Sequence, residues 1–197
     1  MNLDFTPDQL AFRDEARAWL AANHDTAPEI WMGLHKKHVT PRGLTWEDAV
    51  PEALCFGWID GTARSVDDEC TSLYFSPRRR GSVWAATNKA RLEALQAAGH
   101  MHAAGLAVVE RAKADGSWTT LDRSESLTVP DELALAFEDY PGSATTFASF
   151  PASARKQLIY RVDSAKRPET RRRRAEQIAR LAQQGLRADQ QSAPEAP

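Results

Sequence analysis

The strand-like segments of this chain all lie before residue 80, whereas the remainder has helical patterns. In residues 29–37, Ile30, Met32 and Leu34 occupy alternate positions, as in a half-buried strand. Residues 58–66 and 71–79 are typical of two further strands joined by an acidic turn, which predicts an antiparallel hairpin. We therefore expect a small antiparallel sheet within the first half of the chain.

Helices are predicted before, between and after these strands. Residues 7–23 carry apolar side chains at helical spacing, and residues 45–57 begin at a Thr45 cap and end at Gly57. Two more helices are expected from about residue 82 to 99 and from 102 to 116.

The second half of the chain is predicted to be all-helical. Residues 117–129 are polar and irregular, and the segments from 130 to 185 are helical in pattern. The fold class is thus α+β, a mixed helix and antiparallel-sheet half followed by a helical half. The expected domains are an α+β domain at 1–120, a helical module at 121–187 and a disordered Pro/Ala/Gln-rich tail at 188–197.

Composition excludes several classes of protein. The 25 basic and 27 acidic residues give a net charge of −2, so nothing draws the whole chain to nucleic acid or to an anionic membrane. We find neither a transmembrane-length apolar run nor the pattern of a signal peptide. Cys55 and Cys70 have no CxxC spacing. We expect a cytoplasmic protein with reduced thiols and no membrane span.

Asp60 ends the densest apolar run of the sequence, residues 53–59. A catalytic carboxylate needs a partner acid or histidine, and none is close in sequence. Asp60 and Gly61 would form a bend or bulge where the chain leaves the buried pair before them. Alternatively, Asp60 pairs with an arginine of the next strand and orients it, or belongs to a polar site.

Arginines follow an aromatic pair directly before a predicted helix. Arginine forks bind carboxylate and phosphate at two points, and a helix N-terminus attracts anions. The candidate anion site comprises Asp60, Arg78, Arg79, Ser82, Trp84, Asn88 and Lys89. The alternative is a solvated basic loop that pairs with the acidic residues 67–69.

A second basic cluster, Arg171, Arg172, Arg173 and Arg174, lies on the last predicted helix. Four consecutive residues fan around a helix, so these side chains cannot all face one partner. No aromatic side chain for base stacking accompanies them, which argues against nucleic-acid binding. An apolar stripe formed by Ala175, Ile178, Leu181 and Ala182 is expected to dock this helix.

Common catalytic and metal-binding motifs are missing from the sequence. His35 and His38, like His100 and His102, do not form a zinc ligand set, and no phosphate loop, GxSxG or HExxH motif occurs. Cys55 lies in an apolar segment without an adjacent base, as expected of an inert thiol. We predict no catalytic residue, no metal and no cofactor.

Several blocks of sequence resemble the bacteriocin-protection family, also called YdeI or OmpD-associated (OmdA). They are EALCFGWIDG, YFSPRRRGSVWAATN, AAGLAVVERAKADGSW and a C-terminal block with Ala165 to Arg174 as its core. The resemblance extends from about residue 17 to 184. It implies a role in protection against bacteriocins or cationic peptides and, by the family's name alone, an association with the envelope or a porin.

Two function classes follow. The first is a non-enzymatic stress or bacteriocin-protection protein that binds a protein partner or a small anionic ligand through a surface patch of Arg78, Arg79 and Trp84. The second is an enzyme or ligand sensor with a cleft between the halves, in which Asp60 and Arg78 or Arg79 act together with Asn88. A weak nucleic-acid binder that uses the second basic cluster is a third possibility.

Overall fold

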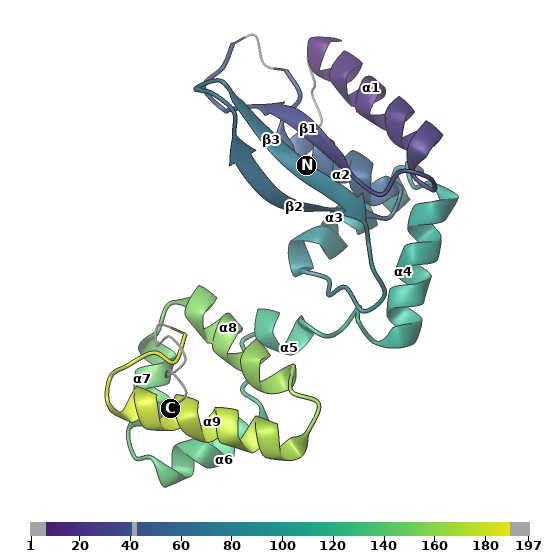
Figure 1. Cartoon of the computed structure of the whole chain (residues 1–197). Coiled ribbons are helices and arrows are strands. Elements are labelled where there is room, and N and C mark those ends of the chain that lie inside the picture. The colour runs from purple at the N-terminus through teal and green to yellow at the C-terminus, as the bar shows by residue number, and fades with distance from the viewer. Residues whose placement is uncertain (1–6, 41–42, 190–197) are drawn as a thin grey trace. The chain divides into compact units, whose positions relative to one another are not determined.

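The computed structural model describes residues 7–40 and 43–189, and these form two compact units. The first unit contains the described residues up to 82 together with 87–118, and the second contains 83–86 and the described residues from 119 onward. An antiparallel sheet with helices is followed by a helical half, so the predicted α+β class is confirmed (Figure 1).

The first unit is built on a three-stranded antiparallel sheet with the order β1-β3-β2. Its strands are β1 (Ile30–His35), β2 (Trp58–Ser65) and β3 (Cys70–Pro77), and β2 and β3 form the predicted hairpin. Met32 lies opposite Leu73, and both side chains are buried, as predicted by the alternation in β1. One face of the sheet therefore contributes to the core.

Among the described residues, this half of the chain forms the helices α1 (Pro7–Asn23), α2 (Trp46–Cys55), α3 (Ala86–Ala97) and α4 (Ala103–Asp115). Thr45 and Asp48 form a capping box at the start of α2, which explains why that helix begins there. Trp19 of α1 meets the buried Trp58 of β2 edge to face, with ring centroids 5.9 Å apart.

Glu52 of α2 carries a carboxylate that is almost completely buried. It accepts hydrogen bonds from Arg13 of α1, and Arg17 Nη1 donates to it at 2.7 Å. Arg17 also donates to the carbonyl oxygen of His100 at 2.8 Å. Glu52 thus joins α1 to α2 and, through Arg17, to the loop that precedes α4.

The second unit consists of short helices around an apolar core. They are α5 (Asp122–Glu125), α6 (Asp131–Asp139), α7 (Ser143–Ser149), α8 (Ala152–Asp163) and α9 (Pro168–Gln183). The predicted stripe of α9 is buried, which confirms how this helix docks. The segment expected to be irregular contains α5, and Ala188, at the start of the expected tail, is part of the core. Residues 190–197 of that tail lie outside the described residues.

None of the helices in the described part of the chain is long and apolar enough to cross a membrane.

A glycine in α4 permits this helix to approach the C-terminal end of α2. A Cβ atom at Gly105 would lie 2.2 Å from the carbonyl oxygen of Cys55. The same oxygen accepts a hydrogen bond from the backbone N–H of His102 at 3.1 Å. The two helices therefore meet backbone to backbone.

We expect Gly105→Ala to lower the free energy of unfolding by about 1–3 kcal/mol. The added methyl group would collide with the backbone carbonyl of Cys55, which cannot rotate away as a side chain can. Urea denaturation measures the effect. Gly33→Ala is the matched control, since no atom lies within 4 Å of a Cβ at Gly33. Equal stability of the two variants would contradict the proposed close contact.

Candidate functional site

Asp60 lies at a bulge of β2 and points toward the helices. The pairing of β2 with β3 shifts register between Asp60 and Ala63, which confirms the predicted bend or bulge. Asp60 is opposite Phe75, a residue with no exposed surface, so the two side chains are on the buried face of the sheet. The indole N–H of Trp46 donates to Asp60 Oδ2 at 3.2 Å.

Arg78, directly after β3, has a buried side chain with 4% of its surface exposed. Its backbone N–H donates to the carbonyl oxygen of Gly57 at 3.0 Å, and its own carbonyl accepts from Arg111 at 3.0 Å. Burial lowers the pKa of the guanidinium to about 10, and the negative charge of Asp60 opposes this effect. Asp60 thus offers Arg78 a countercharge, as one of the alternatives predicted.

Trp46 connects Asp60 to α3. The guanidinium carbon of Arg91 lies 4.4 Å from the centroid of the Trp46 ring, a cation–π contact. Arg91 Nη1 also donates to Asn88 Oδ1 at 2.8 Å. We call Asp60, Arg78, Asn88, Trp46 and Arg91 the Trp46 network.

Two members of this network were missed by sequence reasoning. Trp46 directly follows the helix cap Thr45, and Arg91 lies three residues after Asn88 in the same helix. The second spacing places Arg91 beside Asn88, so it was a usable signal. The stacking of Arg91 on Trp46 depends on the packing of two separate helices and has no local signal.

A pocket of about 490 Å³ adjoins Trp46, and we call it the Trp46 pocket. Leu34, Ala63 and Leu73 provide apolar surface from the three strands, and Lys36 and Lys37 add basic groups at the end of β1. The other lining residues are His35, Trp46, Glu47 and Thr71. The pocket therefore combines an apolar floor with a basic rim, in which the two lysines outnumber the acidic Glu47.

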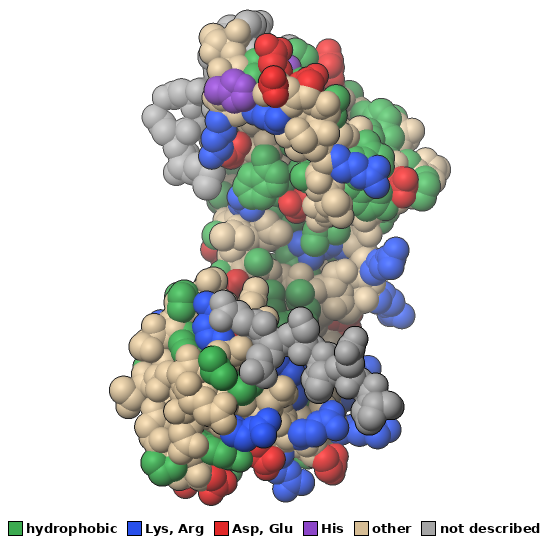
Figure 2. Space-filling model, turned by 60° about the vertical axis from the view of Figure 1, so that its left-hand side comes forward, with side chains coloured by type: hydrophobic (Ala, Val, Ile, Leu, Met, Phe, Trp, Pro, Cys, Tyr) green, Lys and Arg blue, Asp and Glu red, His purple; other side chains and the backbone are tan. Residues whose placement is uncertain are grey.

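Polar contacts hold both lysines of this rim. Lys36 Nζ donates to Ser65 Oγ at 3.1 Å and to the carbonyl oxygen of Asp67 at 2.5 Å. Lys37 Nζ lies 3.6 Å from a carboxylate oxygen of Glu47, and its side chain is 87% exposed. Figure 2 shows that basic, acidic and hydrophobic side chains alternate on one face of the first unit rather than forming a uniformly basic surface.

The remaining candidates of the predicted anion site are dispersed. Arg79 is exposed, Ser82 is half-buried, and Lys89 contacts the ring of Trp118 at 5.1 Å. Trp84 is 1% exposed and belongs to the segment 83–86 of the second unit. A surface patch of Arg78, Arg79 and Trp84 was expected, but the side chains of Arg78 and Trp84 are buried and only Arg79 is exposed. A ligand-binding role for these candidate residues stays a prediction.

The histidines make local contacts. His35 Nδ1 accepts a hydrogen bond from the N–H of Gly43 at 2.9 Å. His102 caps α4 by accepting from the N–H of Ala104 at 3.2 Å, and its ring stacks on Phe56. Over the described residues, no cluster of three His, Cys, Asp or Glu side chains could hold a metal ion.

The second basic cluster divides into anchoring and exposed arginines. Arg171 Nε donates to the carbonyl oxygen of Ala165 at 2.9 Å, and Arg174 Nη1 donates to the carbonyl oxygen of Arg161 and to Ser164 Oγ. Arg172 and Arg173 are exposed. Arg171 and Arg174 therefore bind carbonyls at the end of α8, which fastens α8 to α9.

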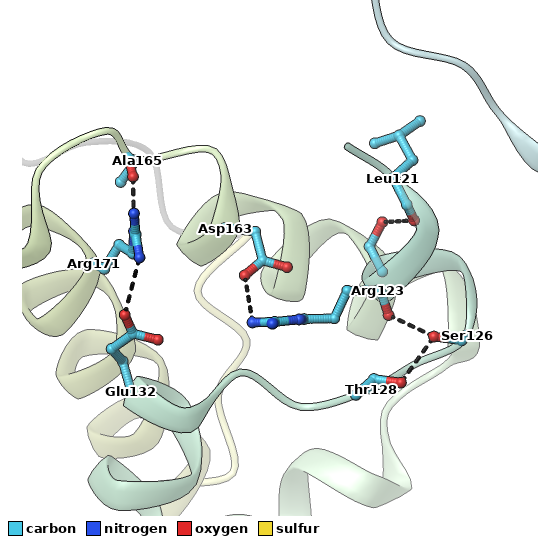
Figure 3. A network of polar contacts seen from close by, with 9 residues as sticks. Leu121, Arg123, Ser126, Thr128, Glu132, Asp163, Ala165 and Arg171 are labelled. Atoms are coloured by element: carbon cyan, nitrogen blue, oxygen red, sulfur yellow. Dashed lines mark hydrogen bonds and ion pairs between the residues drawn. The ribbon is translucent and has the colours of Figure 1, made fainter. Parts of the chain in front are cut away.

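Arg171 also belongs to the polar network of Figure 3, in which its guanidinium lies 3.4 Å from Glu132. Arg123 and Asp163 form a neighbouring ion pair at 3.2 Å (Figure 3). Partial burial raises the pKa of Asp163, an effect that Glu132 reinforces and that the charges of Arg123 and Arg171 oppose. These contacts link α5, α6, α8 and α9.

Two families match separate parts of the chain. The family described as a domain of unknown function, DUF8412, matches residues 9–108, just over half of the chain. The family described as bacteriocin-protection, YdeI or OmpD-associated (OmdA) matches residues 126–185. The OmdA match is narrower than the resemblance expected over residues 17–184. The two blocks of that resemblance that end by residue 88 fall within the DUF8412 match instead. Searches of curated proteins and of solved structures found no match.

We expect Asp60→Asn to lower the free energy of unfolding by about 1–3 kcal/mol, because it removes the countercharge of the buried Arg78 and retains an acceptor for Trp46. The double variant Asp60→Asn/Arg78→Met should recover most of this loss. Urea denaturation of both variants and of the wild type provides the comparison.

The loss of stability caused by Asp60→Asn should also shrink as the pH is raised past about 10. The pKa of Arg78 is lowered in the folded state, so the folded protein releases this proton before the unfolded chain does. Once Arg78 is neutral, Asp60 no longer matches a positive charge. If Asp60→Asn is as stable as the wild type, the charges of Asp60 and Arg78 do not interact.

Replacing Arg171 by Met should destabilise the second unit by about 1–2 kcal/mol. The change removes both the hydrogen bond to the Ala165 carbonyl oxygen and the ion pair with Glu132. Amide hydrogen exchange in α8 and α9 gives the local opening free energy. Arg172→Met, at the exposed neighbour, is the matched control and should change that value by less than about 0.5 kcal/mol. Indistinguishable exchange in the two variants would refute the anchoring role.

Proposed function

Because this chain belongs to the DUF8412 family, which matches residues 9–108, and carries an OmdA match over residues 126–185, we propose that it is a non-enzymatic protein of the bacteriocin-protection type that binds a small anionic ligand. The protective role rests on the description of the OmdA family. Ligand binding rests on one observation, the Trp46 pocket with its apolar floor and basic rim.

The chemistry of the pocket favours a small carboxylate with an apolar or aromatic body. Trp46 offers a ring, and Leu34 and Leu73 offer aliphatic surface for that body. Lys36 and Lys37 provide ammonium groups for the carboxylate. The volume of about 490 Å³ is within the range of small-molecule sites.

The Trp46 network supports this proposal because it holds the indole in place before a ligand arrives. Asp60 binds the N–H edge of the ring, and Arg91 stacks on its face. A side chain that is already held in position loses little conformational entropy upon binding. Arg91 and Trp46 thus form an arginine–aromatic pair beside this pocket, and these residues differ from the predicted Arg78, Arg79 and Trp84.

The enzymatic alternative assigned chemistry to Asp60 with Arg78 or Arg79. Asp60 accepts a hydrogen bond from Trp46 and faces the buried Arg78, whereas Arg79 is exposed. A carboxylate in these surroundings serves to position Trp46, which is why we favour a binding protein. A cytoplasmic location and an envelope partner are further predictions, the latter drawn from the family name alone.

Thermal-shift and calorimetric titrations with benzoate, indole-3-acetate, acetate and phosphate test the proposal. We expect the two aromatic carboxylates to bind. At one hundred times its Kd a ligand stabilises the folded state by about 2.7 kcal/mol, which raises the Tm of a chain of this size by about 5–10 °C. Acetate and phosphate should bind at least tenfold more weakly, because they do not use the apolar floor.

The double variant Lys36→Gln/Lys37→Gln should weaken the binding of benzoate at least tenfold, and Lys166→Gln, at an exposed lysine of the second unit, should leave it unchanged. The Tm of each variant without ligand shows whether folding is affected. If none of the four probes binds the wild type, or if the double variant binds benzoate normally, the proposed site is wrong.

A further inference from the structure

The second unit has a groove of about 500 Å³ whose walls come from the loop after α5 and from α6, α7 and α8. Seven of its nine lining residues are apolar, among them Leu127, Phe137 and Phe147, and the two charged ones are Glu138 and Arg155. This groove contains no residue of the Trp46 pocket or its network, so an inference from it is independent of the function proposed above.

Leu127 occupies a backbone position that favours glycine. Its φ angle is 56°, in the left-handed region. The N–H of Leu127 donates to the carbonyl of Ser124 at 3.2 Å, and the N–H of Thr128 donates to the carbonyl of Arg123 at 2.9 Å. These two bonds define a Schellman motif after α5, with Leu127 at the position where glycine is the usual residue.

Side-chain contacts reinforce this turn. Ser126 Oγ donates to the carbonyl oxygen of Arg123 at 3.1 Å and lies 2.8 Å from Thr128 Oγ1 (Figure 3). The chain therefore keeps a leucine where a glycine would relieve strain. The Leu127 side chain lies in the wall of the groove and also packs against the core of the unit.

Arg155 brings a polar group to this apolar groove. Its Nε atom is buried and donates no hydrogen bond within the part of the chain that the structure describes. A buried N–H without an acceptor costs free energy, and the same guanidinium carries further N–H groups that can bind an acceptor in the groove. A carboxylate is the acceptor that an arginine fork fits best.

Apolar surface continues past the groove on α6. Leu135 is 62% exposed, and it lies next to the lining residues Ala134 and Glu138 on the helix circumference. A partner with several apolar side chains in succession can use both the groove and this leucine. That extent favours a peptide segment over a small amphiphile.

We infer that the groove docks a protein partner through an amphipathic segment, whose apolar side chains pack between Leu127, Phe137 and Phe147 and whose carboxylate binds Arg155. An amphipathic helix laid into an apolar groove is a common mode of peptide recognition. The carboxylate is an Asp or Glu side chain of the segment, which sets its register against the groove.

Selection of displayed random 12-residue peptides on the full chain, with the variant Leu127→Gly for counter-selection, tests this inference. We expect the enriched peptides to share apolar residues spaced by three or four positions and an Asp or Glu. A synthetic copy should bind at least tenfold more weakly to Leu127→Gly and to Arg155→Met. A synthetic peptide in which Gln replaces the Asp or Glu should bind the wild type and Arg155→Met with equal affinity.

Leu186→Ala, at an exposed leucine of the same unit outside the groove, is the matched control and should bind the peptide normally. Circular dichroism shows whether Leu127→Gly and Arg155→Met remain folded, and if either does not, Phe137→Ala replaces it. The inference is wrong if no class of peptides is enriched, or if the enriched peptides bind the groove variants as tightly as the wild type. It is also wrong if decanoate, a small amphiphile with a carboxylate, binds in the groove and no peptide does.

Discussion

The buried carboxylate of Glu52 is the interaction on which the first unit depends. A carboxylate removed from water is stable only when its charge is matched, and here Arg13 and Arg17 of α1 both bind it. The pairing fastens α1 against α2, and Arg17 extends it to the loop before α4. Since α2 also begins with Trp46, the same anchored helix positions the ring of the candidate site.

Tertiary contacts complete that site from three directions. Trp46 stands at the first position of α2, Asp60 reaches it from the bulge of β2, and Arg91 covers it from α3. The bulge is important because it interrupts the regular pairing of β2 with β3 directly after Asp60, the residue that accepts a hydrogen bond from Trp46. The arrangement therefore uses an irregularity of the sheet to place a carboxylate beside an indole.

The second unit uses its arginines in a different way. Arg171 and Arg174 belong to the sequence block that resembles the OmdA family, and both bind carbonyl oxygens where α8 ends. Their neighbours Arg172 and Arg173 face solvent. Part of this basic cluster therefore has a structural role, and the groove between Leu127 and Arg155 is the feature of the second unit that we propose as a docking site.

Local patterns in the sequence predicted the strands and the longer helices in their order, whereas the short helix α5 lies in a segment expected to be irregular. The alternation of Met32 and Leu34, the cap at Thr45 and the stripe of Ile178 and Leu181 are all local, because a strand or helix repeats its buried positions within a few residues. The bulge at Asp60 was predictable from the Asp60-Gly61 pair, which favours a bend or bulge.

What the sequence could not determine is which side chains meet across these elements. It placed Arg78 and Trp84 in a surface patch, because a run of arginines beside aromatic residues is usually solvated. Only the tertiary structure buried both and brought Trp46 to Asp60 and Arg91. Periodicity states which face of an element is buried, whereas contacts between elements depend on how distant segments pack against one another.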